Sequence, residues 1–305
     1  MKITVLGNGG FYNEGLSYNA LAIDGRVLVE TPPDILQSIA RQGMRPAQFD
    51  MVFVSHIHGD HCFGFPFFFF NWLYSGDAES NWRKGNTLTV VGPRGLGEQL
   101  RALLRMAIPH EHPYTEAFER QARLLEVDEE DMVDAGGGLW FGFMATKHSL
   151  PTLALIVGER HGVEGGARPA DVRRGKGPAE ALSTTALRAL PVDGQSSNAL
   201  SASATRALPA PSERFAAARF IYSSDTSMFD GVTRLIESGA QLVLCDTNGD
   251  KENEVHMSPR ELAAAARGRP GDIASGRIRG IHMSKSMERL GDLSFVQPGD
   301  TFILE

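Results

Sequence analysis

The sequence predicts a layered α/β protein, and two observations lead to that prediction. Apolar segments typical of strands alternate with amphipathic segments typical of helices, and they do so in both halves of the chain. Hydrophobic residues make up 42% and charged residues 22% of the 305 residues, as in a globular protein with a sizeable core. Strands mixed with helices throughout favour helices packed on sheets, while the pairing of the strands stays open.

The first half of the chain is expected to begin with a hairpin and a helix. Residues 2–6 and 18–23 alternate or run apolar, and residues 26–30 follow the turn Asp24-Gly25 as a hairpin partner. Thr31 is expected to cap a helix that has Pro32 at its first position. Three more elements are expected further along, namely strands at 51–54 and 88–91 and a helix from Pro93 with one leucine-rich face.

The second half repeats this alternation. Two helices are expected, one over residues 228–237 with Ser227 as its cap and one over residues 259–266. The latter begins with Ser258-Pro259-Arg260-Glu261, in which the serine and the glutamate are spaced as in a capping box. Strands are expected at residues 139–146, 153–157, 220–222, 242–244 and 279–281.

One segment departs from this alternation. Residues 162–214 are rich in Ala, Ser, Arg, Pro and Gly and contain no aromatic residue. Such a composition buries too little apolar surface to offset the entropy of ordering the chain. We therefore expect a single domain over residues 1–305, with 162–214 as a low-complexity surface insertion between two adjacent strands. An arm that contacts substrate is the alternative interpretation of this segment.

Composition also limits the partners and the location of the protein. The net charge of −7 argues against a basic nucleic-acid surface, because phosphate binding uses clustered Lys and Arg. The two cysteines are too few for a disulfide framework, and the first residues lack the long apolar stretch of a signal peptide. We expect a cytoplasmic protein with no membrane partner.

The most apolar run, residues 63–74, consists mainly of aromatic side chains. It contains Pro66 and is too short to cross a bilayer. It is also too apolar on every side for a surface helix, so core packing is the first interpretation. A homodimer interface is the alternative, because large exposed apolar patches usually mark contacts between molecules.

Metal-binding residue types gather directly after the apolar strand at residues 51–54. Three imidazoles and one carboxylate occur within six residues, and all four can bind a borderline cation such as Zn²⁺. A loop between a strand and a helix presents such side chains from a rigid scaffold. The stretch reads Val54-Ser55-His56-Ile57-His58-Gly59-Asp60-His61, an HxHxDH pattern. Because packing gives no ordinary reason for this cluster, it predicts a metal site.

An HxHxDH motif after a strand resembles the metallo-β-lactamase superfamily, and residues further along follow the order of that family. The resemblance extends over nearly the whole chain outside the low-complexity segment. It implies a four-layer αββα sandwich of two related halves, with metals at one edge between the sheets. It also implies that His56, His58 and His148 hold one metal ion, that Asp60, His61 and His282 hold the other, and that Asp225 bridges them.

The chemistry of a paired metal site agrees with this assignment. Two metals about 3.5–4 Å apart can share a nucleophile and hold the oxygens of a phosphoryl centre. The bridge requires a carboxylate such as that of Asp225, because its two oxygens can bind two ions. We expect two divalent ions, with zinc the first choice and manganese or iron as alternatives, since His and Asp suit all three.

The surroundings of the third histidine indicate a branch of the superfamily. His148 lies in Thr146-Lys147-His148-Ser149-Leu150-Pro151, which is similar to the phosphodiesterase branch that contains ribonuclease Z. The stretch Glu30-Thr31-Pro32-Pro33 is closer to phosphodiesterases that open small cyclic phosphates. In the ribonuclease Z branch a histidine backed by a carboxylate assists the leaving group, and His256 and Asp246 take those positions here. The resemblance thus implies catalytic roles for Asp60, His256 and Asp246.

These observations predict a dinuclear metal-dependent hydrolase that acts on a small or cyclic phosphodiester. RNA is a less favoured substrate, because the protein is acidic and residues 109–132 contain no basic or Gly-rich arm like that of ribonuclease Z. The alternatives are a ribonuclease Z-like endonuclease for transfer-RNA 3′ ends, an esterase or lactonase, and a metal-binding protein of the same fold without activity.

Overall fold

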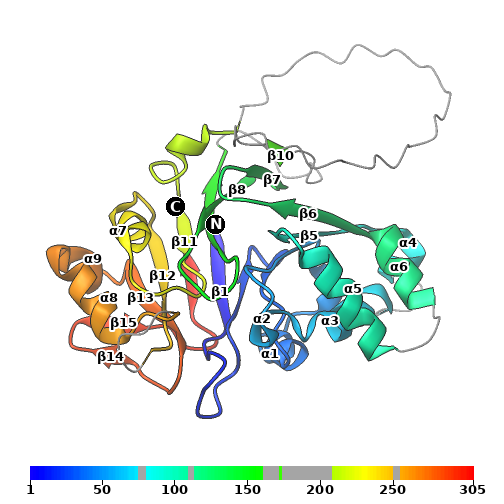
Figure 1. Ribbon diagram of the computed structural model, residues 1–305, viewed down its shortest axis with the longest axis horizontal. Coiled ribbons are helices and arrows are strands. Elements are labelled where there is room, and N and C mark those ends of the chain that lie inside the picture. The colour runs from blue at the N-terminus through cyan, green and yellow to red at the C-terminus, as the bar shows by residue number, and fades with distance from the viewer. Residues whose placement is uncertain (75–79, 109–112, 161–171, 174–207, 250–254) are drawn as a thin grey trace.

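The computed structural model of the chain describes residues 1–74, 80–108, 113–160, 172–173, 208–249 and 255–305. The strands of this part of the chain form two sheets (Figure 1). The first sheet has the order β16-β1-β2-β3-β4-β5-β6, and the second has the order β10-β7-β8-β9-β11-β12-β13-β15-β14.

The strands of the first sheet are β1 (Lys2–Gly7), β2 (Ala20–Ile23), β3 (Val27–Val29), β4 (Met51–Phe53), β5 (Leu88–Pro93), β6 (Ala122–Val127) and β16 (Thr301–Ile303). Those of the second are β7 (Met132–Gly136), β8 (Leu139–Ala145), β9 (Leu153–Glu159), β10 (Val172–Arg173), β11 (Phe220–Tyr222), β12 (Leu242–Thr247), β13 (Ile278–Met283), β14 (Arg289–Leu290) and β15 (Leu293–Phe295). The strands from β3 to β6 run parallel, as do β11, β12, β13 and β15. The carboxyl ends of β11, β12 and β13 therefore meet at one edge of the second sheet.

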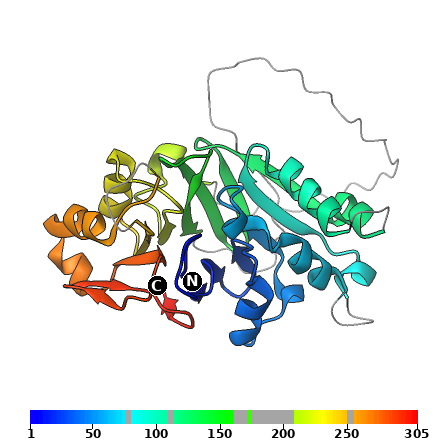
Figure 2. The same ribbon diagram turned by 60° about the horizontal axis from the view of Figure 1, so that its bottom comes forward.

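Helices cover the outer face of each sheet, which gives four layers (Figures 1 and 2). The first sheet is covered by α1 (Ile35–Arg41), α2 (Gly59–Cys62), α3 (Phe65–Tyr74), α4 (Asn81–Lys84), α5 (Leu96–Ala107) and α6 (Pro113–Gln121). The second is covered by α7 (Asp230–Glu237), α8 (Pro259–Ala265) and α9 (Pro270–Ala274). A central apolar core lies between the sheets, with Phe53 of one stacked on Phe143 of the other, and two further cores lie beneath the helices. The predicted αββα sandwich is confirmed.

The capping box predicted at Ser258 is confirmed. The Ser258 hydroxyl accepts a hydrogen bond from the Glu261 backbone N–H at 3.2 Å, and the Glu261 carboxylate accepts one from the Ser258 N–H at 2.7 Å. The two orphan donors at the start of α8 are therefore satisfied.

Two other predicted helix starts are wrong. α1 begins at Ile35 with Asp34 at its N-cap, because Thr31 instead bonds the His61 carbonyl through its N–H at 2.8 Å. α7 begins at Asp230, because the Ser227 backbone N–H and hydroxyl both donate to the Lys147 carbonyl. In both cases the expected cap ties down a loop next to the metal-binding motifs, so a tertiary contact has outweighed local capping.

The helix expected from Pro93 begins three residues later, at Leu96. Gly92 and Pro93 continue β5 in register with β6, and Gly95 has a left-handed φ of 91° that separates the strand from the helix. A left-handed conformation is open to glycine at no steric cost, which explains this residue at the junction.

The aromatic run forms α3 and lies at the surface as well as in the core. Phe65, Phe68, Phe69, Trp72 and Leu73 are buried, as the core interpretation predicts. Phe63, Phe67 and Phe70 are exposed by 49%, 60% and 42%, so core packing accounts for only part of the run. This exposed face is the part of the run that an interface between two copies would use, and the homodimer remains a prediction. In the part of the chain that is described, no helix combines the length and apolar character needed to cross a bilayer.

The predicted insertion leaves the body of the protein between β9 and β11, which pair antiparallel as expected of adjacent strands. Residues 161–171 and 174–207 lie outside the described part of the chain. The described parts of this segment are residues 172–173 and 208–214. β10 pairs with β7, which lies outside the segment. Arg214 is only 8% exposed and donates to the Pro211 carbonyl.

We expect residues 174–207 to be dispensable for folding. Replacing them by a short Gly-Ser turn should shift the melting temperature by only a few degrees, since loop closure costs about 0.6 kcal/mol per doubling of loop length. Turnover of a small phosphodiester should also survive. A matched variant lacking 162–214 also removes β10 and Arg214 and should be less stable. If calorimetry shows that the variant lacking residues 174–207 is unfolded, the segment is an integral part of the fold.

Candidate metal centre

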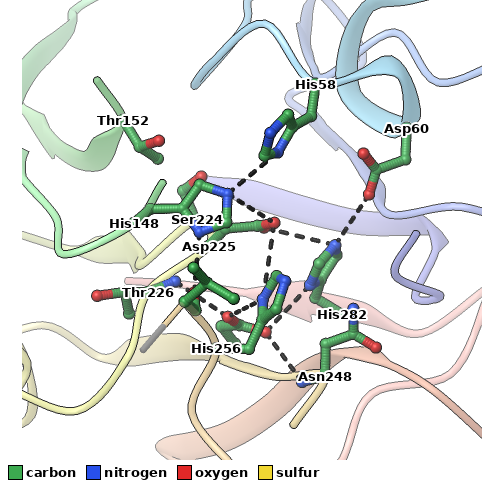
Figure 3. A network of polar contacts seen from close by, with 12 residues as sticks. His58, Asp60, His148, Thr152, Ser224, Asp225, Thr226, Asn248, His256 and His282 are labelled. Carbon is green, nitrogen blue, oxygen red and sulfur yellow. Dashed lines mark hydrogen bonds and ion pairs between the residues drawn. The ribbon is translucent and has the colours of Figure 1, made fainter. Parts of the chain in front are cut away.

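The predicted metal-binding residues lie together at one edge, where loops from both sheets meet (Figure 3). His56 and His58 follow β4 of the first sheet, and Asp60 and His61 form the first turn of α2. The second sheet contributes the remaining three from β8, β11 and β13 or the loops that follow them: His148, Asp225 and His282. Residues separated by more than two hundred positions are thus within contact distance.

A first cluster consists of His56, His58, His148 and one oxygen of Asp225. The Nδ1 atom of His58 lies 3.1 Å from Nε2 of His56 and 3.1 Å from Nε2 of His148. Oδ2 of Asp225 lies 3.8 Å and 3.9 Å from the same two Nε2 atoms. Three ring nitrogens and a carboxylate oxygen therefore point at a common centre.

A second cluster consists of Asp60, His61, His282 and the other oxygen of Asp225. Oδ2 of Asp60 lies 3.3 Å from Nε2 of His61 and 3.3 Å from Nε2 of His282. Oδ1 of Asp225 lies 3.3 Å and 3.4 Å from the same two nitrogens. Asp225 thus contributes one carboxylate oxygen to each cluster.

These spacings fit metal ions. Nitrogen ligands at about 2.0–2.1 Å from a tetrahedral zinc ion lie roughly 3.3 Å from one another, close to the separations in both clusters. Nε2 of His61 and Oδ1 of Asp225 are buried without a hydrogen-bond partner among the described residues. Buried polar atoms are rarely left in this state, and a cation between them would satisfy both. The donor set therefore fits two metal ions.

The charge balance of the centre also favours bound cations. Burial, together with the charge of His61, keeps the pKa of His56 well below its ordinary value, and a neutral imidazole is the form that binds metal. Burial works against protonation of His282, but the carboxylates of Asp225, Asp246 and Asp60 together outweigh it and raise the pKa of His282 to about 10. Positive charge is therefore stabilised between the carboxylates of the second cluster, where a metal ion would lie.

Contacts behind the clusters orient the histidine rings. Nδ1 of His148 donates to the Val255 carbonyl at 2.9 Å, and Nδ1 of His282 faces Oδ1 of Asp246 at 3.0 Å. Nδ1 of His61 lies 3.3 Å from Oε1 of Glu30, an ion-pair contact whose geometry does not form a hydrogen bond. A partner on one ring nitrogen fixes the tautomer and directs the other nitrogen to the metal.

Glu30 is a candidate site residue that the sequence did not single out. Its side chain is fully buried, and its backbone has a left-handed φ of 67°. Ser224 and His282 share this conformation, with φ values of 55° and 58°. Such backbone is uncommon outside glycine and gathers at functional sites, where the surrounding structure holds it. The available signal was a lone carboxylate at the end of an apolar strand.

Asp246 supports two histidines without belonging to a metal cluster. Its Oδ2 accepts from Nδ1 of His256 at 2.9 Å and from the Thr226 N–H at 3.0 Å. Its Oδ1 faces Nδ1 of His282 and accepts from the Asn248 N–H at 3.0 Å. Asp225, Asp246, His256 and His282 are close enough to hold a metal on spacing alone. Because four donors already surround the Asp246 oxygens, we assign this residue an orienting role.

A pocket of about 510 Å³ opens over the centre. It is lined by His58, Asp60, His148 and Asp225 of the clusters, by His256, and by five further residues, Phe11, Tyr12, Ser149, Asn248 and Val255. The structure thus brings His256 to the same cavity as the candidate metal-binding residues, and its catalytic role remains a prediction. Cys62 and Cys245 are buried thiols that do not line the pocket, and burial raises the pKa of each to about 12.

The chain has the metallo-β-lactamase fold. Solved structures of this fold superimpose along almost the whole chain at 13% sequence identity. The YhfI protein of Bacillus subtilis has a TM-score of 0.59 over 99% of this chain and 98% of its own. A diphosphatase of the PhnP family has 0.59 over 100% and 98%, and the short form of human tRNase Z has 0.57 over 100% of both chains.

The particular family follows from a match over more than half of the chain. Residues 1–165 match the family described as anti-Pycsar protein Apyc1, and the chain belongs to that family. It is 35% identical to ribonuclease Z of Lactobacillus johnsonii over 69 residues, which are 23% of this chain and 20% of that protein. It is 28% identical to ribonuclease Z of Clostridium tetani over 162 residues, which are 50% of this chain and 49% of that protein. The chain thus spans a fifth to a half of these curated relatives.

Two metal ions per chain are expected from the two clusters. His58→Ala and His282→Ala should each release one ion, because each removes a nitrogen from a different cluster. Elemental analysis after gel filtration measures this directly, with His256→Ala as the control that retains both ions. A single ion that survives His282→Ala would contradict the dinuclear centre.

Glu30→Gln should weaken metal binding about 10–100-fold, because it replaces the carboxylate behind His61 by a neutral amide of the same shape. Competition with a chromophoric chelator measures this affinity, and the melting temperature reports whether the variant is folded. Glu237→Gln, an exposed change at the end of α7, is the matched control. Unchanged affinity in a folded Glu30→Gln protein would remove its role in orienting His61.

Proposed function

We propose that the protein is a dinuclear metal-dependent phosphodiesterase that acts on a small or cyclic phosphodiester. The observation that carries this proposal is the carboxylate of Asp225, which offers one oxygen to each of two ligand clusters at the base of a pocket. The first cluster supplies His56, His58 and His148 to one ion, and the second supplies Asp60, His61 and His282 to the other. We take zinc as the metal because nitrogen donors predominate, with manganese or iron as alternatives.

Paired metal ions, when bound, supply a water-derived nucleophile and neutralise the negative charge that develops on the phosphoryl oxygens. The protein side chains balance the charge and orient the ligands. Asp60 and Asp225 balance the positive charge, while Glu30 and Asp246 hold the rings of His61 and His282 in place. The residues that line the pocket limit how a phosphodiester can lie against the two ligand clusters.

His256 is placed to protonate the departing oxygen. Its Nδ1 is bonded to Asp246, so Nε2 lies on the side of the ring that faces away from that carboxylate. Burial works against protonation, but the hydrogen bond with Asp246 and the charges of Asp246 and Asp225 together outweigh it and raise the pKa of His256 above its ordinary value. A histidine with a raised pKa holds its proton to a higher pH than a free imidazole, which favours a role as general acid.

The volume of the pocket and the net charge of the protein favour a small substrate. The pocket volume of about 510 Å³ lies in the range of sites for small molecules, and the net charge of −7 opposes a long polyanion. Cleavage of transfer-RNA 3′ ends is the second candidate, because the curated relatives that match are ribonucleases Z.

A substrate comparison on metal-analysed protein tests the proposal. Bis(p-nitrophenyl) phosphate and a 3′,5′-cyclic nucleotide should be hydrolysed, whereas p-nitrophenyl acetate and precursor transfer RNA should not. Cleavage at the 3′ end of the transfer RNA would favour the second candidate. Ester turnover alone would indicate an esterase, and inactivity of protein with its full metal content would indicate a metal-binding role without catalysis.

His256→Ala should lower turnover by about 10²–10⁴-fold, as expected for a positioned acid. Metal content and melting temperature should change little, because seven other residues form the clusters and Ser258 caps α8. The loss should be smaller for p-nitrophenolate, a leaving group that needs no proton, than for an alkoxide. Equal losses on both substrates would indicate that His256 binds the phosphate, and full activity on both would exclude any role in the reaction.

A further inference from the structure

We propose that Phe11 and Tyr12 bind a planar ring of the substrate, such as a nucleobase, by stacking. This inference rests on the proposed phosphodiesterase function and names the part of the substrate that lies outside the metal centre. Both residues line the pocket over the two metal clusters. They lie in the loop between β1 and β2, the dark blue segment that extends below β1 in Figure 1.

Both rings are accessible at the pocket. Phe11 is 51% and Tyr12 is 80% exposed, which sets them apart from the many aromatic side chains in the cores. Their centroids are 5.2 Å apart with an interplanar angle of 63°, so the rings meet edge to face. They therefore do not cover one another by parallel stacking, and a flat ligand can pack on a ring face.

Hydrogen bonds hold the loop in a defined position relative to the metal centre. The N–H of Gly10 donates to the Met283 carbonyl at 2.9 Å, and the N–H of Glu14 donates to the Ser284 carbonyl at 2.8 Å. Both acceptors directly follow His282. The aromatic pair lies between these two attachment points, so its position is tied to that of a metal-binding residue.

Further contacts restrict the same loop from within. The Asn13 side-chain amide donates to the Gly10 carbonyl at 2.7 Å, and its oxygen accepts from the Leu16 N–H at 2.7 Å. A Cβ atom on Gly10 would lie 2.4 Å from Nδ2 of Asn248, so a larger residue here would displace the Asn248 side chain. A site whose shape exists before binding loses less entropy when the ligand arrives.

The remaining pocket residues suggest what the rings recognise. None of the described residues that line the pocket is Lys or Arg. The phosphate charge is therefore left to the metal centre, and the wall formed by Phe11 and Tyr12 contributes aromatic surface without a cationic side chain. Base–aromatic stacking requires only a flat π face on the ligand, which is why we assign this wall to a planar ring rather than to a second anionic group.

The test compares two substrates that differ only in the ring. Adenosine 3′,5′-cyclic phosphate and methyl β-ribofuranoside 3′,5′-cyclic phosphate share the sugar, the cyclic ester and the leaving group. In the unaltered protein the base-bearing compound should have a KM about 5- to 150-fold lower, the range expected for stacking of one base. Phe11→Leu combined with Tyr12→Leu should raise the KM of that compound by the same factor. The kcat value and the KM of the abasic compound should change little.

Two control variants separate stacking from structural damage. Tyr12→Phe keeps the ring and should retain the low KM, whereas Tyr12→Leu should not. Phe67→Leu makes the same exchange at an exposed phenylalanine on α3, outside the pocket, and should leave both KM values unchanged. Equal KM values for the two substrates in the unaltered protein would overturn the proposal, as would equal losses on both substrates in the double variant.

A binding measurement separates this inference from the proposed function. Calorimetry on metal-loaded protein compares adenosine 5′-monophosphate with ribose 5-phosphate, neither of which needs to be cleaved. The aromatic pair should make the nucleotide bind more tightly, and the double leucine variant should remove the difference. If no phosphodiester is turned over but this difference is present, the phosphodiesterase function fails and ring binding stands. If phosphodiesters are turned over and the difference is absent, ring binding fails alone.

Discussion

The structure of the candidate metal centre depends on one buried carboxylate that faces two groups of nitrogen atoms. Asp225 is 1% exposed and lies between histidines of the first cluster and histidines of the second. Asp60, Asp246 and Glu30 are buried close by, so several carboxylates share a region from which water is excluded. Buried carboxylates are tolerated when cations or protonated partners compensate them. Metal binding would meet this requirement and would link the two sheets, because the donor atoms come from both.

The fold brings the buried carboxylates and the histidines close together. Parallel strands of the second sheet end at one edge and bring Asp225, Asp246 and His282 together, while the loop after β4 adds His56 and His58 from the first sheet. Left-handed backbone at Glu30, Ser224 and His282 turns the chain at these ends. Loops that serve the site also use residues that would otherwise cap helices, as Thr31 and Ser227 show. At these two positions a residue that could cap a helix instead holds a loop of the candidate site in place.

The sequence predicted the fold class and a candidate metal-binding set because these leave strong local signals. HxHxDH is contiguous, and His148, Asp225 and His282 each follow or end an apolar strand, so their order along the chain identified them. Other features depend on contacts between distant segments. Glu30 stands 3.3 Å from His61 only after β3 and α2 are in place, and Phe11 and Tyr12 have no periodic pattern that sets them apart from a surface loop. The strands β6, β7 and β16 escaped prediction because they are short or carry polar residues, and pairing with neighbouring strands completes them.

Anomalous diffraction from crystals of zinc-loaded protein, recorded at the zinc absorption edge, tests the central claim most directly. The account predicts two peaks about 3.5–4 Å apart, one among His56, His58 and His148 and the other among Asp60, His61 and His282, with Asp225 between them. A single peak would contradict it, because Asp225 would then have no second ion to join. A peak held by Asp246 and His256 would also contradict it, because His256 would then have a role other than proton transfer.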